Sequence, residues 1–199
     1  MANKIIWLAI FLVVLIWSGI HPKDQLTWFL EVLPALIGVV VMVISYKSFR
    51  LTPLLYIFIL VHSVILMIGG HYTYAEVPLF DYFKEWFGFE RNNYDKLGHL
   101  AQGFVPALIA REIIIRKNII PRPVWQFFFI VCFCLALSAF YELIEWWAAI
   151  AMGEEDAEAF LAIQGDVWDT QSDMGLALFG AIFSLLTLSK LHDKQLSRL

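Results

Sequence analysis

Six long apolar runs dominate this chain of 199 residues, and segments containing charged residues or proline separate them. An apolar stretch of about 20 residues is long enough to cross the hydrocarbon core of a membrane as a helix. The sequence predicts such spans at about 5–20, 29–46, 53–70, 94–115, 124–151 and 167–189. We therefore expect an all-α fold: a polytopic membrane protein whose bundle of about six transmembrane helices forms a single domain over residues 1–199.

The composition agrees with a membrane protein. Hydrophobic residues make up 60% of the chain and charged residues only 16%, whereas about 25% of residues are charged in a typical soluble domain. Because the basic residues are few and scattered, we expect no nucleic-acid partner, and membrane lipids are the expected surroundings. Lys4 and the apolar run after it resemble a signal peptide, but no small-x-small cleavage pattern follows, so we expect an uncleaved first span.

The positive charges predict the orientation of the spans. If the N-terminus is cytoplasmic, ten of the fourteen Lys and Arg residues fall in segments on that side. Basic residues are enriched in the cytoplasmic loops of membrane proteins. We therefore expect both termini in the cytoplasm and the loops after the first, third and fifth spans on the outer side.

The longest outer loop, residues 71–93, has a helical pattern of its own. Aromatic residues recur at helical spacing, at Phe80, Phe83 and Phe87, and charged residues fall on the opposite side. This pattern predicts a short amphipathic helix at about 79–88 that lies in the plane of the lipid headgroups. The helix either covers a site beneath it or forms an aromatic belt that anchors the protein, and the sequence leaves both readings open.

The acidic residues are concentrated in one part of the sequence. Nine Asp or Glu residues and no Lys or Arg lie between Glu142 and Asp173, from the end of the fifth span to the start of the sixth. The middle of this stretch, residues 154–158, is typical of a solvated loop, whereas its ends fall on helices. Carboxylates that lack cationic partners in such a place predict a cation site.

Three helix ends on the outer side each place ionisable residues on one narrow face. The sets are Asp95 and His99 on the fourth span, Glu142 and Glu145 on the fifth, and Asp166, Asp169 and Asp173 on the sixth. The members of each set lie within about 60° of one another around a helix. A charge in the middle of a span costs about 2.5–3.5 kcal/mol to insert, so such residues indicate function. Asp95 and Asp166 lie at the outer ends of their spans. For these two, a favourable interaction with the helix dipole explains the acidic residue as well as a functional role does.

Carboxylates together with an imidazole form the donor set of a divalent metal site. Carboxylate oxygens suit Mg, Ca or Mn, and a histidine adds Zn to this range. A bound dication would relieve the repulsion among the carboxylates, as would shared protons. The candidate metal ligands are Asp95, His99, Glu142, Asp169 and Asp173, and the additional candidates are His71 and Asp166.

Several of these motifs resemble those of a known family. They are the run GDVWDTQSDM at 165–174, the segment DKLGH at 95–99, and the residues Tyr141, Glu142, Glu145 and Trp146. In these motifs the chain is similar to the YjdF-like family of bacterial inner-membrane proteins, over nearly its whole length. The resemblance implies a multi-pass protein of the bacterial inner membrane. It implies no reaction, because the family has no established biochemical activity.

A more distant similarity connects the chain with the VanZ-like family, which is associated with glycopeptide-antibiotic resistance. The pattern of that family is D-K-x-x-H on one helix, E-x-x-Q on another and D-x-x-x-N on the last. Residues 95–99 match the first motif, but Glu145 replaces the Gln of the second and Asp173 replaces the Asn of the third. Both differences add negative charge, which favours a cation site and weakens the transfer of VanZ-like behaviour.

The sequence is compatible with more than one class of function. The first is a metal-dependent hydrolase of lipid headgroups or envelope precursors at the outer face, with Glu142 or Glu145 as the general base. The second is a non-enzymatic protein that binds or transports a cation or a cationic ligand. The third is a structural membrane protein that a metal stabilises. Whether the chain is an enzyme stays open at this point.

Overall fold

The computed structural model describes residues 2–152 and 164–199, and this part of the chain contains seven helices and no strand. The helices are α1 (Ala2–Gly19), α2 (Gln25–Ser45), α3 (Pro53–Tyr72), α4 (Pro78–Phe87), α5 (Tyr94–Arg116), α6 (Pro123–Met152) and α8 (Asp169–Leu196). The predicted all-α fold is confirmed. The acidic segment 154–158, expected to be a solvated loop, lies outside the described residues.

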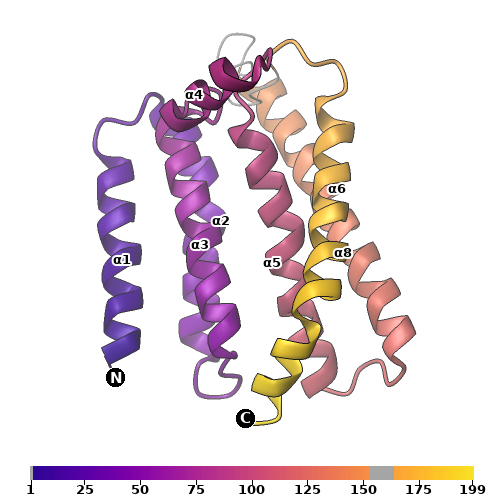
Figure 1. The fold of residues 1–199 in the computed structure, drawn as a ribbon. Helices are drawn as coiled ribbons and strands as arrows, with labels where there is room; N and C mark the ends of the chain where they lie inside the picture. The colour runs from indigo at the N-terminus through magenta and orange to yellow at the C-terminus, as the bar shows by residue number, and fades with distance from the viewer. Residues whose placement is uncertain (1, 153–163) are drawn as a thin grey trace.

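Six of these helices run side by side, and the short α4 lies across one end of the bundle (Figure 1). Both chain termini lie at the opposite end. We call these two ends the α4 end and the terminal end. Which of them faces the cytoplasm stays a prediction.

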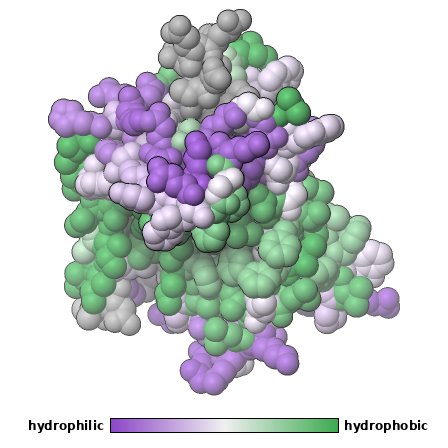
Figure 2. Space-filling model, turned by 45° about the horizontal axis from the view of Figure 1, so that its top comes forward, coloured by the Kyte–Doolittle hydropathy of each residue, from purple (hydrophilic) through white to green (hydrophobic). Residues whose placement is uncertain are grey.

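Within residues 2–152 and 164–199, four helices are long and apolar enough to cross a membrane, namely α2, α3, α6 and α8. The apolar part of α1 is shorter, at Lys4–Gly19, and α5 carries charged residues at both of its ends. The expected number of about six spans therefore stays a prediction. Figure 2 shows hydrophilic side chains gathered at the α4 end and an apolar surface around the middle of the bundle. Exposed apolar side chains such as Ile44 and Leu186 belong to the outer surface of the bundle, as a membrane protein requires.

The predicted amphipathic helix is present as α4. Its Phe80 ring packs edge-on against Tyr94 at the start of α5, with ring centroids 5.0 Å apart. Other large side chains of α4 are exposed, among them Trp86 at 75% and Phe87 at 67%. The helix therefore lies over the end of the bundle at which α5 begins, with part of its aromatic surface uncovered.

Small residues allow α5 to approach α8 closely. A Cβ atom added at Gly103 of α5 would collide with the backbone carbonyl of Ala177, and one added at Gly180 of α8 would collide with that of Leu100. Small residues at such crossings let two membrane helices pack backbone against backbone. This contact fixes α8 against the face of α5 from which the functional candidates project.

The substitution Gly103→Ala is expected to destabilise the protein by about 1–3 kcal/mol, because the helices must separate to make room for the new methyl group. The matched control is Gly175→Ala in α8, where an added Cβ meets no atom within 4 Å. That change should be neutral or slightly stabilising, since Ala favours a helix over Gly by about 1 kcal/mol. Thermal unfolding of both variants in the same detergent tests the contact, and equal unfolding temperatures would contradict it.

Candidate metal centre

The first turns of α5 place Asp95 and His99 on one buried face. Their residue exposures are 7% and 6%. The Nε2 atom of His99 lies 3.4 Å from Oδ1 of Asp95, and Nδ1 lies 3.1 Å from Oε1 of Gln102, one turn further along the helix. Asp95 precedes His99 by four residues and Gln102 follows it by three, so the imidazole lies between a carboxylate and an amide.

Two other helices bring carboxylates to the same histidine. Glu142 of α6 has Oε1 3.7 Å from Nδ1 of His99, and Asp173 of α8 has Oδ2 3.9 Å from Nε2. Glu145 follows Glu142 by one turn of α6. The structure thus brings together five of the predicted site residues, from the three helices expected: Asp95, His99, Glu142, Glu145 and Asp173.

Two sets of three side chains in this cluster have ligand atoms within 4.8 Å of one another. One set is Asp95, His99 and Asp173, all buried, and the other is His99, Glu142 and Glu145. In the described part of the chain, Oδ2 of Asp95 and Oε1 of Glu142 are buried and have no hydrogen-bond partner. A buried carboxylate oxygen without a hydrogen bond is costly, so these atoms are suited to accept a cation.

The expectation that the carboxylates lack cationic partners is wrong. Lys96 Nζ lies 2.8 Å from Oδ1 of Asp169 and 2.9 Å from Oδ1 of Asp173. Arg91 reaches the same Oδ1 of Asp169 at 2.5 Å and lies 3.8 Å from Asp95 Oδ2. Both cations precede the acidic stretch by many residues in the sequence, and only the packing of α5 on α8 brings them to it.

These two cations are fewer than the carboxylates of the cluster. Five carboxylates, those of Asp95, Glu142, Glu145, Asp169 and Asp173, share the site with the permanent charges of Arg91 and Lys96. With all five carboxylates ionised and His99 neutral, three negative charges would be unbalanced. Charges removed from water need compensation, and one dication would leave a single negative charge.

The remaining candidate ligands lie in different places. Asp169 is outside both sets of three. Its Oδ1 accepts from Lys96 and Arg91, and its assignment as a ligand stays a prediction. Asp166 is an ion-pair partner of Arg91 at 3.4 Å and accepts a hydrogen bond from the backbone N–H of Trp168. His71 contacts α1, since its Nδ1 lies 2.9 Å from the carbonyl oxygen of Ser18, so the structure does not bring it to the cluster.

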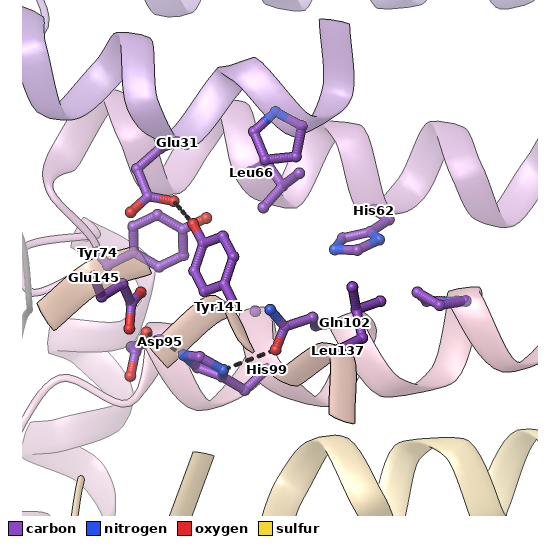
Figure 3. Close-up of a pocket in the computed structure, with 13 residues that line it drawn as sticks. Glu31, His62, Leu66, Tyr74, Asp95, His99, Gln102, Leu137, Tyr141 and Glu145 are labelled. Atoms are coloured by element: carbon purple, nitrogen blue, oxygen red, sulfur yellow. Dashed lines mark hydrogen bonds and ion pairs between the residues drawn. The ribbon is translucent and has the colours of Figure 1, made fainter. Parts of the chain in front are cut away.

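A cavity of about 200 Å³ adjoins the cluster between α2, α3, α5 and α6. Asp95, His99 and Glu145 line it on one side, and it extends toward His62 of α3 (Figure 3). One of its most buried polar residues, Glu31 of α2, is 4% exposed and is not among the site residues predicted from the sequence. Its position inside an apolar run is the signal that could have found it.

Tyr74 enters this cavity through an unusual turn after α3. Thr73 and Tyr74 both have positive φ values, 59° and 56°, which non-glycine residues rarely adopt. Glycine makes room for the ring, since a Cβ at Gly69 would collide with it and one at Gly98 would lie 3.1 Å from it. Burial, reinforced by the nearby Glu31 carboxylate, raises the pKa of Tyr74 well above its usual value. The Tyr74 hydroxyl is therefore a neutral group at physiological pH.

The fold and the buried cluster define a multi-helix integral membrane protein with an ionisable site inside its helix bundle. The chain belongs to the family described as "Predicted membrane protein (DUF2238)", which matches residues 3–194. It is 51% identical over 185 residues to the inner membrane protein YjdF of Escherichia coli (strain K12), covering 93% of this chain and 88% of that protein. No solved structure matches. The resemblance to the YjdF-like family is confirmed, the similarity to the VanZ-like family stays a prediction, and neither name states an activity.

Proposed function

We propose that this chain is a membrane protein with a divalent metal centre whose ligands are Nε2 of His99 and carboxylate oxygens of Asp95 and Asp173. The observation that carries the proposal is the environment of His99. Its Nδ1 lies at hydrogen-bond distance from Gln102 Oε1, so an N–H there would donate to the amide oxygen. The lone pair of Nε2 then faces Oδ1 of Asp95 and Oδ2 of Asp173. Histidine ligands in metal sites typically donate their other N–H in this way.

Asp173 is suited to this role because its two oxygens have different partners. Oδ1 accepts from Lys96 at 2.9 Å, which holds the side chain, and Oδ2 faces His99. A ligand set of one nitrogen and several carboxylate oxygens suits Zn or Mn, and it can also bind Mg or Ca. The relative's name places it in an inner membrane, and we extend this location to the present chain, with the termini in the cytoplasm and the α4 end outside.

The activity that this site supports best is hydrolysis of a lipid headgroup or envelope precursor. When bound, a divalent metal supplies Lewis-acid activation of water. Glu142 and Glu145 lie outside the proposed ligand set, which leaves one of them to accept the proton. Glu145 is the better placed, because it lines the cavity beside Asp95 and His99. A non-enzymatic cation-binding protein is the alternative, and the number of carboxylates in the cluster is compatible with it.

The metal content of the purified protein tests this proposal. Wild-type protein prepared without chelators should carry about one divalent metal ion per chain, and His99→Ala should carry none, because it removes the shared ligand. The matched control is His71→Ala, which removes a histidine at the same end of the bundle that contacts Ser18 instead of the cluster, and it should keep the metal. Wild-type protein that neither contains nor takes up Zn or Mn would overturn the metal centre.

A second arm of the experiment separates enzyme from binder. With metal bound, Glu145→Gln should reduce turnover of an envelope lipid extract by about 10²–10⁴-fold, since a general base contributes that factor. Its metal content should not change. No turnover by metal-loaded wild-type protein on any envelope lipid would exclude the hydrolase and leave the binding function.

A further inference from the structure

The cavity beside the metal centre has the size and lining of a site for a small organic group. Its volume is about 200 Å³, larger than the engineered cavity of about 150 Å³ that is known to bind benzene. Apolar residues such as Leu66 and Leu137 line much of it. Pockets of this kind bind organic ligands through an apolar wall and a few convergent polar groups.

Three of the polar side chains that line the cavity are acidic. Glu31, Asp95 and Glu145 come from three different helices and all line it. Figure 3 shows Glu31, Tyr74, Tyr141, Glu145 and Asp95 gathered at one side of the cavity, away from His62. A ligand that reaches this side therefore meets carboxylates and phenol rings together.

Glu31 is the buried carboxylate that the metal centre does not use. Its Oε2 accepts a hydrogen bond from the Tyr141 hydroxyl at 3.2 Å, and it belongs to neither set of three potential metal ligands. In the described part of the chain, no basic side chain forms an ion pair with it. A buried carboxylate held by neutral hydroxyl groups alone is incompletely compensated and attracts a cation.

Asp95 gives a second, independent sign of a missing cation at the same cavity. The residue is more than nine-tenths buried, with 7% exposed, and its Oδ2 has no hydrogen-bond partner within the described residues. Arg91 approaches this atom only to 3.8 Å. The cavity thus has one carboxylate without an ion pair and another with an unfilled hydrogen-bonding position.

We infer that this cavity binds an organic ammonium group, with Glu31 as its counter-ion. A metal ion alone would leave most of the volume and the apolar wall without a role, whereas an ammonium group with alkyl substituents contacts both. The rings of Tyr74 and Tyr141 add attraction, because aromatic faces bind ammonium cations. The same chemistry occurs in free ammonium compounds such as choline or protonated ethanolamine and in lipid headgroups that carry an ammonium group. The inference goes beyond the metal centre and does not depend on it.

Calorimetric titration of metal-free protein in detergent with choline tests the charge requirement. Choline should bind, and its uncharged carbon isostere, 3,3-dimethylbutan-1-ol, should bind at least tenfold more weakly. Glu31→Gln should weaken choline binding by roughly 30-fold or more, as expected when a buried charge loses its partner. Glu76→Gln is the matched control, since that glutamate is exposed and pairs with Lys23, and it should bind choline as the wild type does.

Two further measurements distinguish the source of the amine and separate this site from the metal centre. Protein in nanodiscs of phosphatidylethanolamine should bind choline more weakly than protein in phosphatidylglycerol if the lipid headgroup occupies the cavity, and equally if a free ammonium compound is the ligand. Asp173→Asn should lose the metal but keep choline binding. Glu31→Gln should keep the metal and lose choline binding. Equal binding of choline and its isostere, equal binding by wild type and Glu31→Gln, or no choline binding in any of these preparations would overturn the inference.

Discussion

Glu112→Leu is expected to lower the free energy of unfolding by about 3–5 kcal/mol, because it removes one partner from a buried ionic network. Glu112 of α5 is fully buried at the terminal end of the bundle. Its carboxylate accepts hydrogen bonds from Thr52 Oγ1 at 2.8 Å, Arg116 Nη1 at 2.8 Å and the backbone N–H of Thr52. His192 Nε2, also fully buried, lies 3.0 Å from it.

The loss is large because three helices depend on this one carboxylate. Thr52 precedes α3, His192 belongs to α8, and both would retain buried polar groups without a partner. Denaturation of detergent-solubilised protein, followed by circular dichroism, measures the effect. The matched control is Asp193→Leu, which removes an acid that pairs with Arg111 at 2.6 Å but is 59% exposed, so its cost should stay within about 1 kcal/mol. Equal losses for the two variants would show that the Glu112 network does not support the fold.

This network also shows which contacts can be predicted from a single sequence and which cannot. The sequence around Glu112 predicts an ordinary interfacial salt bridge, and the pair with Arg116 is indeed present at i, i+4. The complete burial of Glu112 depends on Thr52 and His192, which are 60 and 80 residues away in the chain. Helical periodicity describes neighbours on one helix and carries no information about which other helix packs against that face.

The same limit explains what was predicted and what was missed at the metal centre. Asp95, His99 and Glu142 were selected because helical spacing places ionisable residues on one face at a helix end, and their faces do converge on His99. Lys96 was missed as a partner because it projects about 100° away from Asp95 around the helix. Its long side chain nevertheless reaches Asp173 on α8, since the small residues of α5 and α8 bring these helices close together.

Lys96→Met is expected to destabilise the metal-free protein by about 3–5 kcal/mol, because it leaves a buried acid without its cation. The ammonium group of Lys96 pairs with Asp169 and Asp173 and contacts the Ser172 hydroxyl. Asp169 keeps Arg91 as a partner, but the Asp173 side chain, 3% exposed, keeps only the distant His99 nitrogen at 3.9 Å. Methionine retains most of the length of the lysine side chain, so the effect reports mainly on charge. Lys84→Met is the control, since Lys84 of α4 forms no ion pair within the described residues.

Added metal should restore much of the stability that Lys96→Met loses if the proposed centre exists. A ligand present at 100 times its dissociation constant stabilises a folded protein by about 2.7 kcal/mol. Because Lys96→Met adds one unbalanced negative charge beside Asp173, the variant should bind the dication more tightly than the wild type and gain more stability from it. Unfolding curves of both proteins in chelator and in Zn or Mn measure the difference. The contrary result is that acidification in chelator restores the stability of the variant and the metals do not. In that case the carboxylates around His99 take up protons, and the proposed metal centre is wrong.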